Sequence, residues 1–358
     1  MTLPALKIGD FIAKVPIVQG GMGIGISLSG LASAVANEGG IGVIAAAMIG
    51  IHEPGIFKDP EKTNADVLRR EIRTAKENSD GVLGVNIMVA LSDFSNLVKV
   101  AIKEKIDIIF SGAGLPLDLP QYLGEGVRTK LVPIVSSGRA ASILCKKWMS
   151  RFSYLPDAFV VEGPMAGGHL GIKVTQLDNP KSALEHIVPQ VIEAVKPYID
   201  TYKKHIPIIA GGGIYTGEDI YKFIKMGVDG VQMGTRFVAT DECDADLAFK
   251  QAYIDAKEED VVIIKSPVGL PGQAIRNEFL DEVDSGKKTV FKCPYRCIST
   301  CDYKKAPYCI GSALANAKKG KLRHGFAFAG KNAYRVDKIM PVKMLINLLR
   351  EQYAACCP

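Results

Sequence analysis

Residues 206–236 read IPIIAGGGIYTGEDIYKFIKMGVDGVQMGTR and contain two short apolar runs, each followed directly by a glycine-rich turn. The first run ends in Ala210-Gly211-Gly212-Gly213-Ile214 and the second in Met233-Gly234-Thr235-Arg236. The amphipathic stretch between them has the spacing of a helix. Because the carboxyl ends of parallel strands meet at one edge, the two turns are expected to lie side by side. Backbone amides can approach a phosphate closely at such turns, since no side chain intervenes.

The same alternation of strand-like and helical stretches extends through the first 240 residues. The expected strands are Val15–Val18, Ile41–Ala45, Leu83–Met88, Ile106–Phe110, Leu131–Val135, Ala158–Val161, Ile206–Ala210 and Gly230–Met233. The expected helices are Leu31–Asn37, Ala65–Glu77, Phe94–Glu104, Leu119–Gly126, Arg139–Met149, Ala183–Val195 and Gly217–Met226. Eight βα units in a stretch of this length predict an α/β fold, a closed (β/α)8 TIM barrel rather than an open doubly wound sheet.

The alternation ends at residue 240, which divides the chain into three expected parts. Residues 1–240 form the barrel. Residues 241–320 form a smaller lid or substrate subdomain, inserted before the C-terminal helix. Residues 321–358 close the barrel, with Val342–Tyr353 as its eighth helix.

The composition narrows the class of protein. The chain has 358 residues, of which 47% are hydrophobic and 23% are charged, and this suits one large α/β domain with an appendage. The net charge of +6 is spread along the chain, without the basic stripe interleaved with aromatics that marks a nucleic-acid surface. No apolar run approaches the roughly 20 residues of a membrane helix, and the N-terminus lacks a signal-peptide pattern. We therefore expect a cytoplasmic protein that binds neither nucleic acid nor membrane.

Two further positions are expected to face the same edge of the barrel as the glycine turns. The first strand ends in Gln19-Gly20-Gly21-Met22-Gly23, a turn that lets backbone approach a flat ligand. The alternative is an ordinary flexible loop. Asn86 follows the third strand and either contacts a ligand or caps a turn.

A histidine ends the glycine-rich loop after the sixth strand, which reads Val161-Glu162-Gly163-Pro164-Met165-Ala166-Gly167-Gly168-His169. Barrel enzymes keep their chemistry at this end of the strands, and an imidazole titrates near neutral pH. His169 is therefore the candidate general acid or base. A purely structural histidine is the alternative.

Several of these segments together resemble the nitronate monooxygenase family. They are Pro16-Ile17-Val18-Gln19-Gly20-Gly21-Met22, Asn86, Ala166-Gly167-Gly168-His169-Leu170-Gly171, Ala210-Gly211-Gly212-Gly213-Ile214 and Val231-Gln232-Met233-Gly234-Thr235-Arg236-Phe237. The same superfamily includes the flavin-dependent enoyl-acyl carrier protein reductase. One departure stands out, because family members often carry a glutamate where this chain has Met165.

The resemblance implies that FMN is the cofactor, with its phosphate at the two glycine turns and its ring near Gly21, Met22 and Asn86. His169 would then face the substrate side of the ring. The full set of implied cofactor-binding residues is Gly21, Met22, Gly23, Asn86, Gly167, Gly168, Gly211, Gly212, Gly213, Gln232, Met233, Gly234 and Thr235.

Three activities follow from this resemblance and from the cysteines described below. The first is an FMN-dependent oxidoreductase that oxidises alkyl nitronates or nitroalkanes with O2. The second is an enoyl-thioester reductase in which NAD(P)H reduces the flavin. The third is a flavin and iron–sulfur carrier that exchanges electrons with a ferredoxin-like partner. The expected partners are a small-molecule or acyl-thioester substrate and an electron donor, either NAD(P)H or a ferredoxin-like protein. A homodimer is a further alternative.

Four of the eight cysteines fall within seventeen residues, as Cys293, Cys297, Cys301 and Cys309. Without a signal peptide they are expected to be reduced thiols rather than disulfides. Four thiolates can surround a [4Fe–4S] cluster or a structural zinc ion. The C-x3-C-x3-C-x7-C spacing suits zinc less well than a cluster, and four ordinary thiols are the remaining alternative.

Overall fold

The structure is a computed structural model that describes residues 3–287, 293 and 295–357. At its centre lies a closed barrel of parallel strands in the order β10-β11-β3-β4-β5-β6-β7-β8. These strands are β3 (Ile17–Gln19), β4 (Ile41–Ala45), β5 (Val82–Asn86), β6 (Ile108–Ser111), β7 (Lys130–Val135), β8 (Phe159–Glu162), β10 (Ile208–Gly211) and β11 (Gly230–Met233). The predicted TIM barrel is confirmed.

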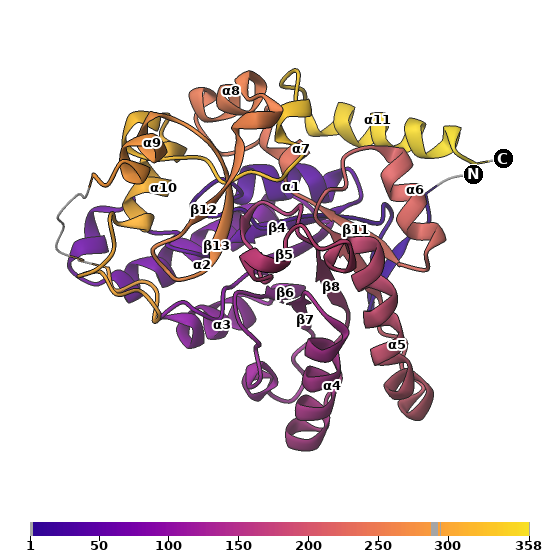
Figure 1. Cartoon of the computed structure of the whole chain (residues 1–358). Coiled ribbons are helices and arrows are strands. Elements are labelled where there is room, and N and C mark those ends of the chain that lie inside the picture. Colours follow the sequence, from indigo (N-terminus) through magenta and orange to yellow (C-terminus); the bar gives the residue numbers. More distant parts are fainter. Residues whose placement is uncertain (1–2, 288–292, 294, 358) are drawn as a thin grey trace.

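Helices cover the outside of the barrel (Figure 1). They are α1 (Ser29–Asn37), α2 (Pro60–Asn78), α3 (Phe94–Lys103), α4 (Gly138–Phe152), α5 (Leu184–Tyr202), α6 (Gly217–Lys225) and α11 (Val342–Ala355). Helix α11 packs against both α6 and α1, so the end of the chain joins the first and last βα units. The contact with α6 is close, since the Gly217 amide donates to Oε1 of Gln352 over 2.9 Å.

The helix expected over Leu119–Gly126 is wrong, because the structure has only a short 3-10 turn at Leu119–Tyr122. Pro120 lies inside the segment and cannot donate the backbone hydrogen bond that a helix needs. Gly126, with a φ of +76°, turns the backbone out of helical geometry.

The N-terminal hairpin closes the amino end of the barrel. It consists of β1 (Leu6–Ile8) and β2 (Phe11–Ala13), which pair antiparallel. Leu6 and Ile8 are fully buried against the side chains that fill the barrel. That interior cluster consists of Leu6, Ile8, Ala13, Val18, Ile41, Val43, Ile108, Phe110, Val132, Ala158, Val160 and Ile209. Because the interior is packed, a ligand has room only at the carboxyl end of the strands.

The segment between β11 and α11 adds a smaller group of elements. They are α7 (Thr235–Val238), α8 (Leu247–Asp255), β12 (Val261–Lys265), β13 (Pro271–Ile275), α9 (Glu278–Asp284) and α10 (Ile310–Lys318). Strand β13 pairs antiparallel with β12 and also with β9 (Gly168–His169), which belongs to the loop after β8. These elements have a hydrophobic cluster of their own around Phe326 and Tyr308. The inserted segment and the histidine loop thus form one sheet.

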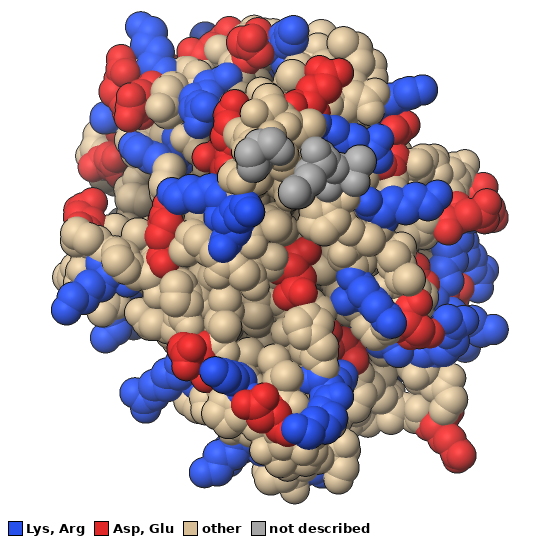
Figure 2. Space-filling model, turned by 90° about the vertical axis from the view of Figure 1, so that its right-hand side faces the viewer, with Lys and Arg blue, Asp and Glu red and all other residues tan. Residues whose placement is uncertain are grey.

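Charges of both signs are mixed on the surface. Figure 2 shows Lys and Arg side chains interspersed with Asp and Glu over the face that it presents. Among the described residues, no helix is both long enough and apolar enough to cross a membrane.

Candidate active site

The turn after β10 bends at two glycines. Gly212 and Gly213 have φ angles of +100° and +87°, which favour glycine. Asn332 donates from Nδ2 to the carbonyl oxygen of Gly213 over 2.7 Å and so fixes the turn. Within the described part of the chain, neither glycine amide donates to a backbone carbonyl outside the regular elements. The turn therefore offers free amide donors to an anion.

The turn after β11 lies beside the first one, because Gln232 is paired with Gly211 in the sheet. The Met233 carbonyl accepts a hydrogen bond of 2.9 Å from the Gly20 amide. Next along the chain, Gly234 leads into α7, and Thr235 is the first residue of that helix. The glycine turns at the ends of β3, β10 and β11 therefore converge on one space.

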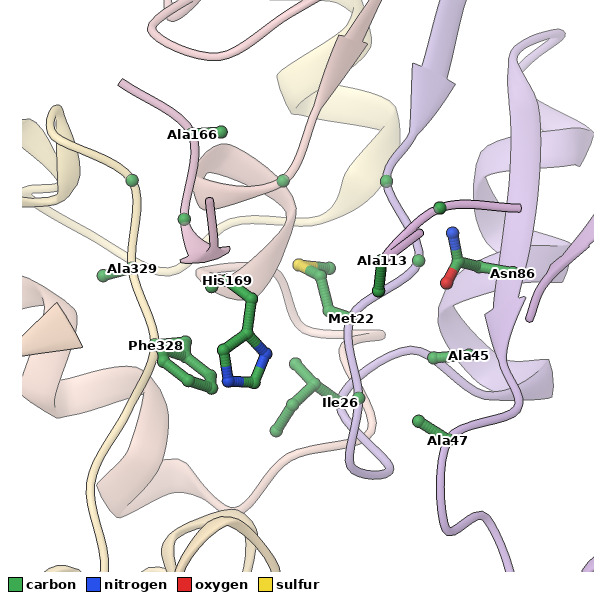
Figure 3. A pocket seen from close by; sticks show the side chains of 18 of the residues that line it. Met22, Ile26, Ala45, Ala47, Asn86, Ala113, Ala166, His169, Phe328 and Ala329 are labelled. Carbon is green, nitrogen blue, oxygen red and sulfur yellow. The ribbon is translucent and has the colours of Figure 1, made fainter. Parts of the chain in front are cut away.

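The wall across from these turns is formed by the loop after β3 and the end of β5. A Cβ atom on Gly21 would lie 2.3 Å from the Cβ atom of Asn86, so only glycine fits there. A Cβ on Gly23 would lie 3.2 Å from the Cβ of Ala47. Met22 lies between this wall and His169 in Figure 3.

These segments enclose a cavity of about 280 Å³. The predicted residues that line it are Gly21, Met22, Gly23, Asn86, Gly167, Gly168, His169, Gly212, Gly213, Gln232, Met233, Gly234 and Thr235. Gly211 does not line the cavity. It is the last residue of β10, and its carbonyl accepts from the Gly163 amide over 2.9 Å. The structure thus brings all but one of the proposed flavin-site residues to the wall of one cavity.

His169 lies deep in this cavity. Its Nε2 atom is 2.8 Å from the hydroxyl of Ser266. Its ring packs edge-on against Phe328, with centroids 4.9 Å apart, and Figure 3 shows these two side chains next to each other. Burial lowers the pKa of His169 to about 4, because the surrounding protein disfavours the charged imidazolium. The imidazole is therefore neutral at pH 7.

Glu162 ends β8 and lines the same cavity. Burial raises its pKa to about 7, because the surrounding protein penalises the carboxylate. Met165 also lines the cavity, where its Sδ atom would lie 2.9 Å from a Cβ on Gly213. Met165 therefore places an apolar side chain against the first glycine turn, at the position where the resemblance led us to expect a glutamate.

Sequence reasoning missed three residues of the site, namely Ser266, Phe328 and Asn332. All three line the cavity or contact His169 from the segment that follows β11. Gly330, which marks a close approach to the backbone at Gly167, is a signal in the sequence near Phe328 and Asn332, and Ser266 has no such signal.

The four clustered cysteines lie beside this site and line a second cavity of about 350 Å³. Burial raises the pKa of Cys297 to about 12, and the neighbouring thiols of Cys309, Cys293 and Cys301 add to the rise. Among the described residues, no three Cys, His, Asp or Glu side chains are arranged to hold a metal ion. Cluster binding therefore stays a prediction at this point.

The comparison with protein families decides where the chain belongs. The family model described as nitronate monooxygenase matches residues 6–97 and 89–352. The chain belongs to the nitronate monooxygenase family. The match runs through the barrel and the inserted segment, and it confirms the resemblance carried by the glycine turns and the histidine loop.

Proteins with different described activities are similar to this chain. A Mycobacterium tuberculosis protein, (3aS,4S,5R,7aS)-5-hydroxy-7a-methyl-1-oxo-octahydro-1H-indene-4-carboxyl-CoA dehydrogenase, is 28% identical over 76% of this chain and 66% of its own length. A probable nitronate monooxygenase of Staphylococcus aureus strain Newman is 27% identical over 83% of this chain and 85% of its own. The structure of FabK from Thermotoga maritima superposes with a TM-score of 0.72 at 28% identity, covering 95% of this chain and 93% of that one.

As a member of the nitronate monooxygenase family, the chain is a flavin-dependent oxidoreductase that acts on small-molecule substrates. The geometry of the cavity also fits a flavin, independently of the comparisons. Its wall has glycine where a Cβ would collide, at Gly21 and Gly213, and it has free amides at the turn after β10.

Proposed function

We propose that the cofactor is FMN, with its phosphate at the turns after β10 and β11. The free amides of Gly212 and Gly213 support this position, since backbone donors at such turns suit a phosphate. The ring would lie between the Gly21–Asn86 wall and His169. Bound FMN supplies two-electron redox chemistry, and the protein supplies orientation and access.

The proposed reaction is reduction of an enoyl thioester. The position of His169 carries this proposal, because its ring lines the cavity, contacts Ser266 and packs against Phe328. A base that removes a proton from carbon becomes a cation, which burial at this position disfavours. A neutral imidazole can instead donate a hydrogen bond to the carbonyl oxygen of a thioester. Ser266 engages Nε2, so Nδ1 is the ring nitrogen left to meet the substrate.

Apolar side chains around the cavity support an acyl substrate. Ile26 and Phe328 flank His169 in Figure 3, and Leu314 and Ile310 extend the apolar wall from α10. An aliphatic chain would bury against them. The Mycobacterium tuberculosis relative is named as a dehydrogenase of a carboxyl-CoA compound. The similarity to it also supports a thioester as the substrate.

Oxidation of alkyl nitronates with O2 is the second candidate. A nitronate is already ionised, so its oxidation needs no protein base and is compatible with a neutral His169. The Staphylococcus aureus relative is named as a probable nitronate monooxygenase, and the similarity to it favours this activity. Nitroalkane oxidation is disfavoured by comparison, because it begins with removal of a proton from carbon.

An anaerobic absorbance titration of the purified protein distinguishes the candidates. The flavin absorbance should bleach with NADH or NADPH and return on addition of a short-chain enoyl-CoA. Return of the absorbance only with O2, together with O2 uptake driven by an alkyl nitronate, would establish the second candidate instead. A protein purified without flavin and unable to bind added FMN would overturn both. His169→Ala should lower turnover at least about tenfold, the equivalent of one hydrogen bond in the transition state.

A further inference from the structure

The structure brings the four clustered cysteines around a single space. Cys293, Cys297, Cys301 and Cys309 all line the cavity of about 350 Å³ that lies outside the flavin site. The first three come from the loop between α9 and α10, and Cys309 is the residue before α10. Among the described residues, the other four cysteines lie elsewhere and line none of this cavity.

The cysteine loop is fixed to the barrel by backbone hydrogen bonds. The Ser92 amide donates to the carbonyl oxygen of Cys297 over 3.0 Å, and the Ser92 hydroxyl donates to the carbonyl of Arg296 over 2.6 Å. On the other side, the Ser299 amide donates to the carbonyl of Ala90 over 2.9 Å. Ala90 and Ser92 belong to the loop that follows β5 and Asn86. The position of Cys297 is therefore set by the same loop that forms the wall of the flavin site.

The two cavities share a wall. Cys297, Ile298 and Ile310 line both the cysteine cavity and the flavin cavity. A Cβ on Gly311 would lie 4.0 Å from the Sγ atom of Cys297, and Gly311 itself lines the flavin cavity. Cys297, Ile298 and Ile310 therefore lie between the two spaces.

Two local features stabilise negative charge at Cys293 and at Cys309. The Arg296 amide donates to the Sγ atom of Cys293 over 3.3 Å, a contact that stabilises a metal-bound thiolate. Helix α10 begins directly after Cys309, so the positive end of a nine-residue helix points at this residue. A cluster held by four cysteine thiolates carries net negative charge, which both features stabilise.

We propose that Cys293, Cys297, Cys301 and Cys309 bind a [4Fe–4S] cluster that exchanges single electrons with the flavin site across the shared wall. Four thiolates are the usual ligands of such a cluster. Zinc would draw the four sulfurs to about 2.3 Å from one ion, whereas the cavity that the four cysteines line has a volume of about 350 Å³. The arrangement of the described side chains holds no such single-ion site.

The electron relay rests on the proposed FMN, whereas cluster binding does not. Each transfer moves one electron and no atoms. An external one-electron donor of the ferredoxin class would be oxidised by one electron and the cluster reduced by one. The cluster would return to its oxidised state by passing that electron to FMN, and two such electrons with two protons from solvent would complete the reduction of bound FMN.

The first test is iron and acid-labile sulfide analysis of protein purified without oxygen. We expect about four iron and four sulfide per chain, with broad absorbance near 400 nm in addition to the flavin bands. One zinc per chain without sulfide would overturn the proposal. So would absence of iron after reconstitution with ferrous iron and sulfide. FMN released by denaturation is measured on the same sample, so that loss of the cluster and loss of the flavin are separate results.

Matched cysteine variants locate the cluster. Cys297→Ser and Cys301→Ser should each lose most of the iron and sulfide, and Cys301→Ser, which lies outside the flavin cavity, should keep FMN. Cys356→Ser, near the C-terminus, should keep both. Full iron content in both cluster variants would overturn the assignment. Cys301 lies less deeply buried than Cys297, so its variant keeps the test decisive if Cys297→Ser does not fold.

A donor experiment tests the relay. A ferredoxin is reduced with dithionite, freed of excess reagent and mixed anaerobically with wild-type protein or with Cys301→Ser. Flavin bleaching should be at least about tenfold slower in the variant, while bleaching by NAD(P)H stays unchanged. Equal rates of flavin bleaching by ferredoxin in the two proteins would overturn the relay. Cluster binding would then be decided by the iron and sulfide analysis alone.

Discussion

Gly167 and Gly330 approach so closely that a Cβ atom on Gly167 would lie 2.6 Å from the backbone nitrogen of Gly330. Gly330 in turn faces Thr235, because a Cβ on Gly330 would lie 2.8 Å from Oγ1 of Thr235. The histidine loop, the segment before α11 and the turn after β11 therefore meet at the proposed phosphate site. None of the three can shift without moving the others.

Gly167→Ala should therefore weaken flavin binding. The added methyl group must push the Gly330 segment away from Thr235, and such overpacking costs about 1–3 kcal/mol. If the displacement falls on the phosphate site, the Kd for FMN rises about tenfold or more. The Kd is measured from the quenching of FMN fluorescence on titration with apoprotein. Gly124→Ala is the control, since a Cβ there meets nothing within 4 Å. Equal Kd values for the two variants would contradict the shared contact.

Glu162→Gln should stabilise the flavin-free protein at alkaline pH. Burial raises the pKa of Glu162 to about 7 from 4.5. The proton is then bound more tightly in the folded state, so the stability from Glu162 is complete below pH 4.5 and is lost as the pH rises through 7. At pH 8 the variant should be more stable by up to roughly 3 kcal/mol, with no such gain at pH 4. Urea unfolding at both values measures the difference, and an equal gain at both would contradict it.

His169→Gln should change how the stability of the protein depends on pH, and it should do so at acidic rather than alkaline pH. The pKa of His169 falls from 6.5 to about 4 in the folded protein, so its stability is complete above pH 6.5 and is lost as the pH falls toward 4. Glutamine carries no such titration. Relative to the variant, flavin-free wild type should lose roughly 2 kcal/mol between pH 7.5 and pH 5. A constant difference between the two proteins across this range would show that His169 titrates normally.

The strands were predictable because they are buried on both faces. Such strands appear as short β-branched runs bounded by glycine, and Ile41–Ala45 and Gly230–Met233 are found with the predicted bounds. The segment Leu119–Gly126 has apolar residues at helical intervals as well, but Pro120 and two glycines decide its backbone. Local steric limits prevailed over hydrophobic spacing there.

Part of the site was predictable because glycine marks it. The turn at Gly212 and Gly213 is visible in the sequence because its φ angles of +100° and +87° favour glycine. Ser266 reaches His169 across 97 positions of sequence, through the pairing of β13 with the two-residue strand β9. A pairing so short has no periodicity in the sequence, so its partners emerge only from the folded chain.

Ser266→Ala should impair turnover without weakening FMN binding. Ser266 lies 2.8 Å from Nε2 of His169, and removing this hydrogen bond frees the ring to rotate and to change tautomer. We expect kcat to fall about tenfold, equivalent to about 1.4 kcal/mol. The Kd for FMN should stay within about twofold, because Ser266 does not contact the phosphate turns. Ser266→Thr keeps the hydroxyl and should restore most of the rate. No recovery with threonine would attribute the loss to packing rather than to the hydrogen bond.

Gly21→Ala tests the other wall of the flavin site, and Asn86 supplies its compensating partner. The new Cβ would lie 2.3 Å from the Cβ of Asn86, which is the last residue of β5. This overlap can be relieved only if the end of a barrel strand moves. The single variant should therefore lose FMN binding by about a hundredfold or more, as expected for roughly 3 kcal/mol of overlap. Asn86→Gly removes the atom that collides. If steric overlap is the cause, Gly21→Ala combined with Asn86→Gly should bind FMN about as well as Asn86→Gly alone. If the double variant binds no better than Gly21→Ala, the methyl group must instead occupy space that the flavin ring needs. Isothermal titration of the four apoproteins with FMN separates these two outcomes.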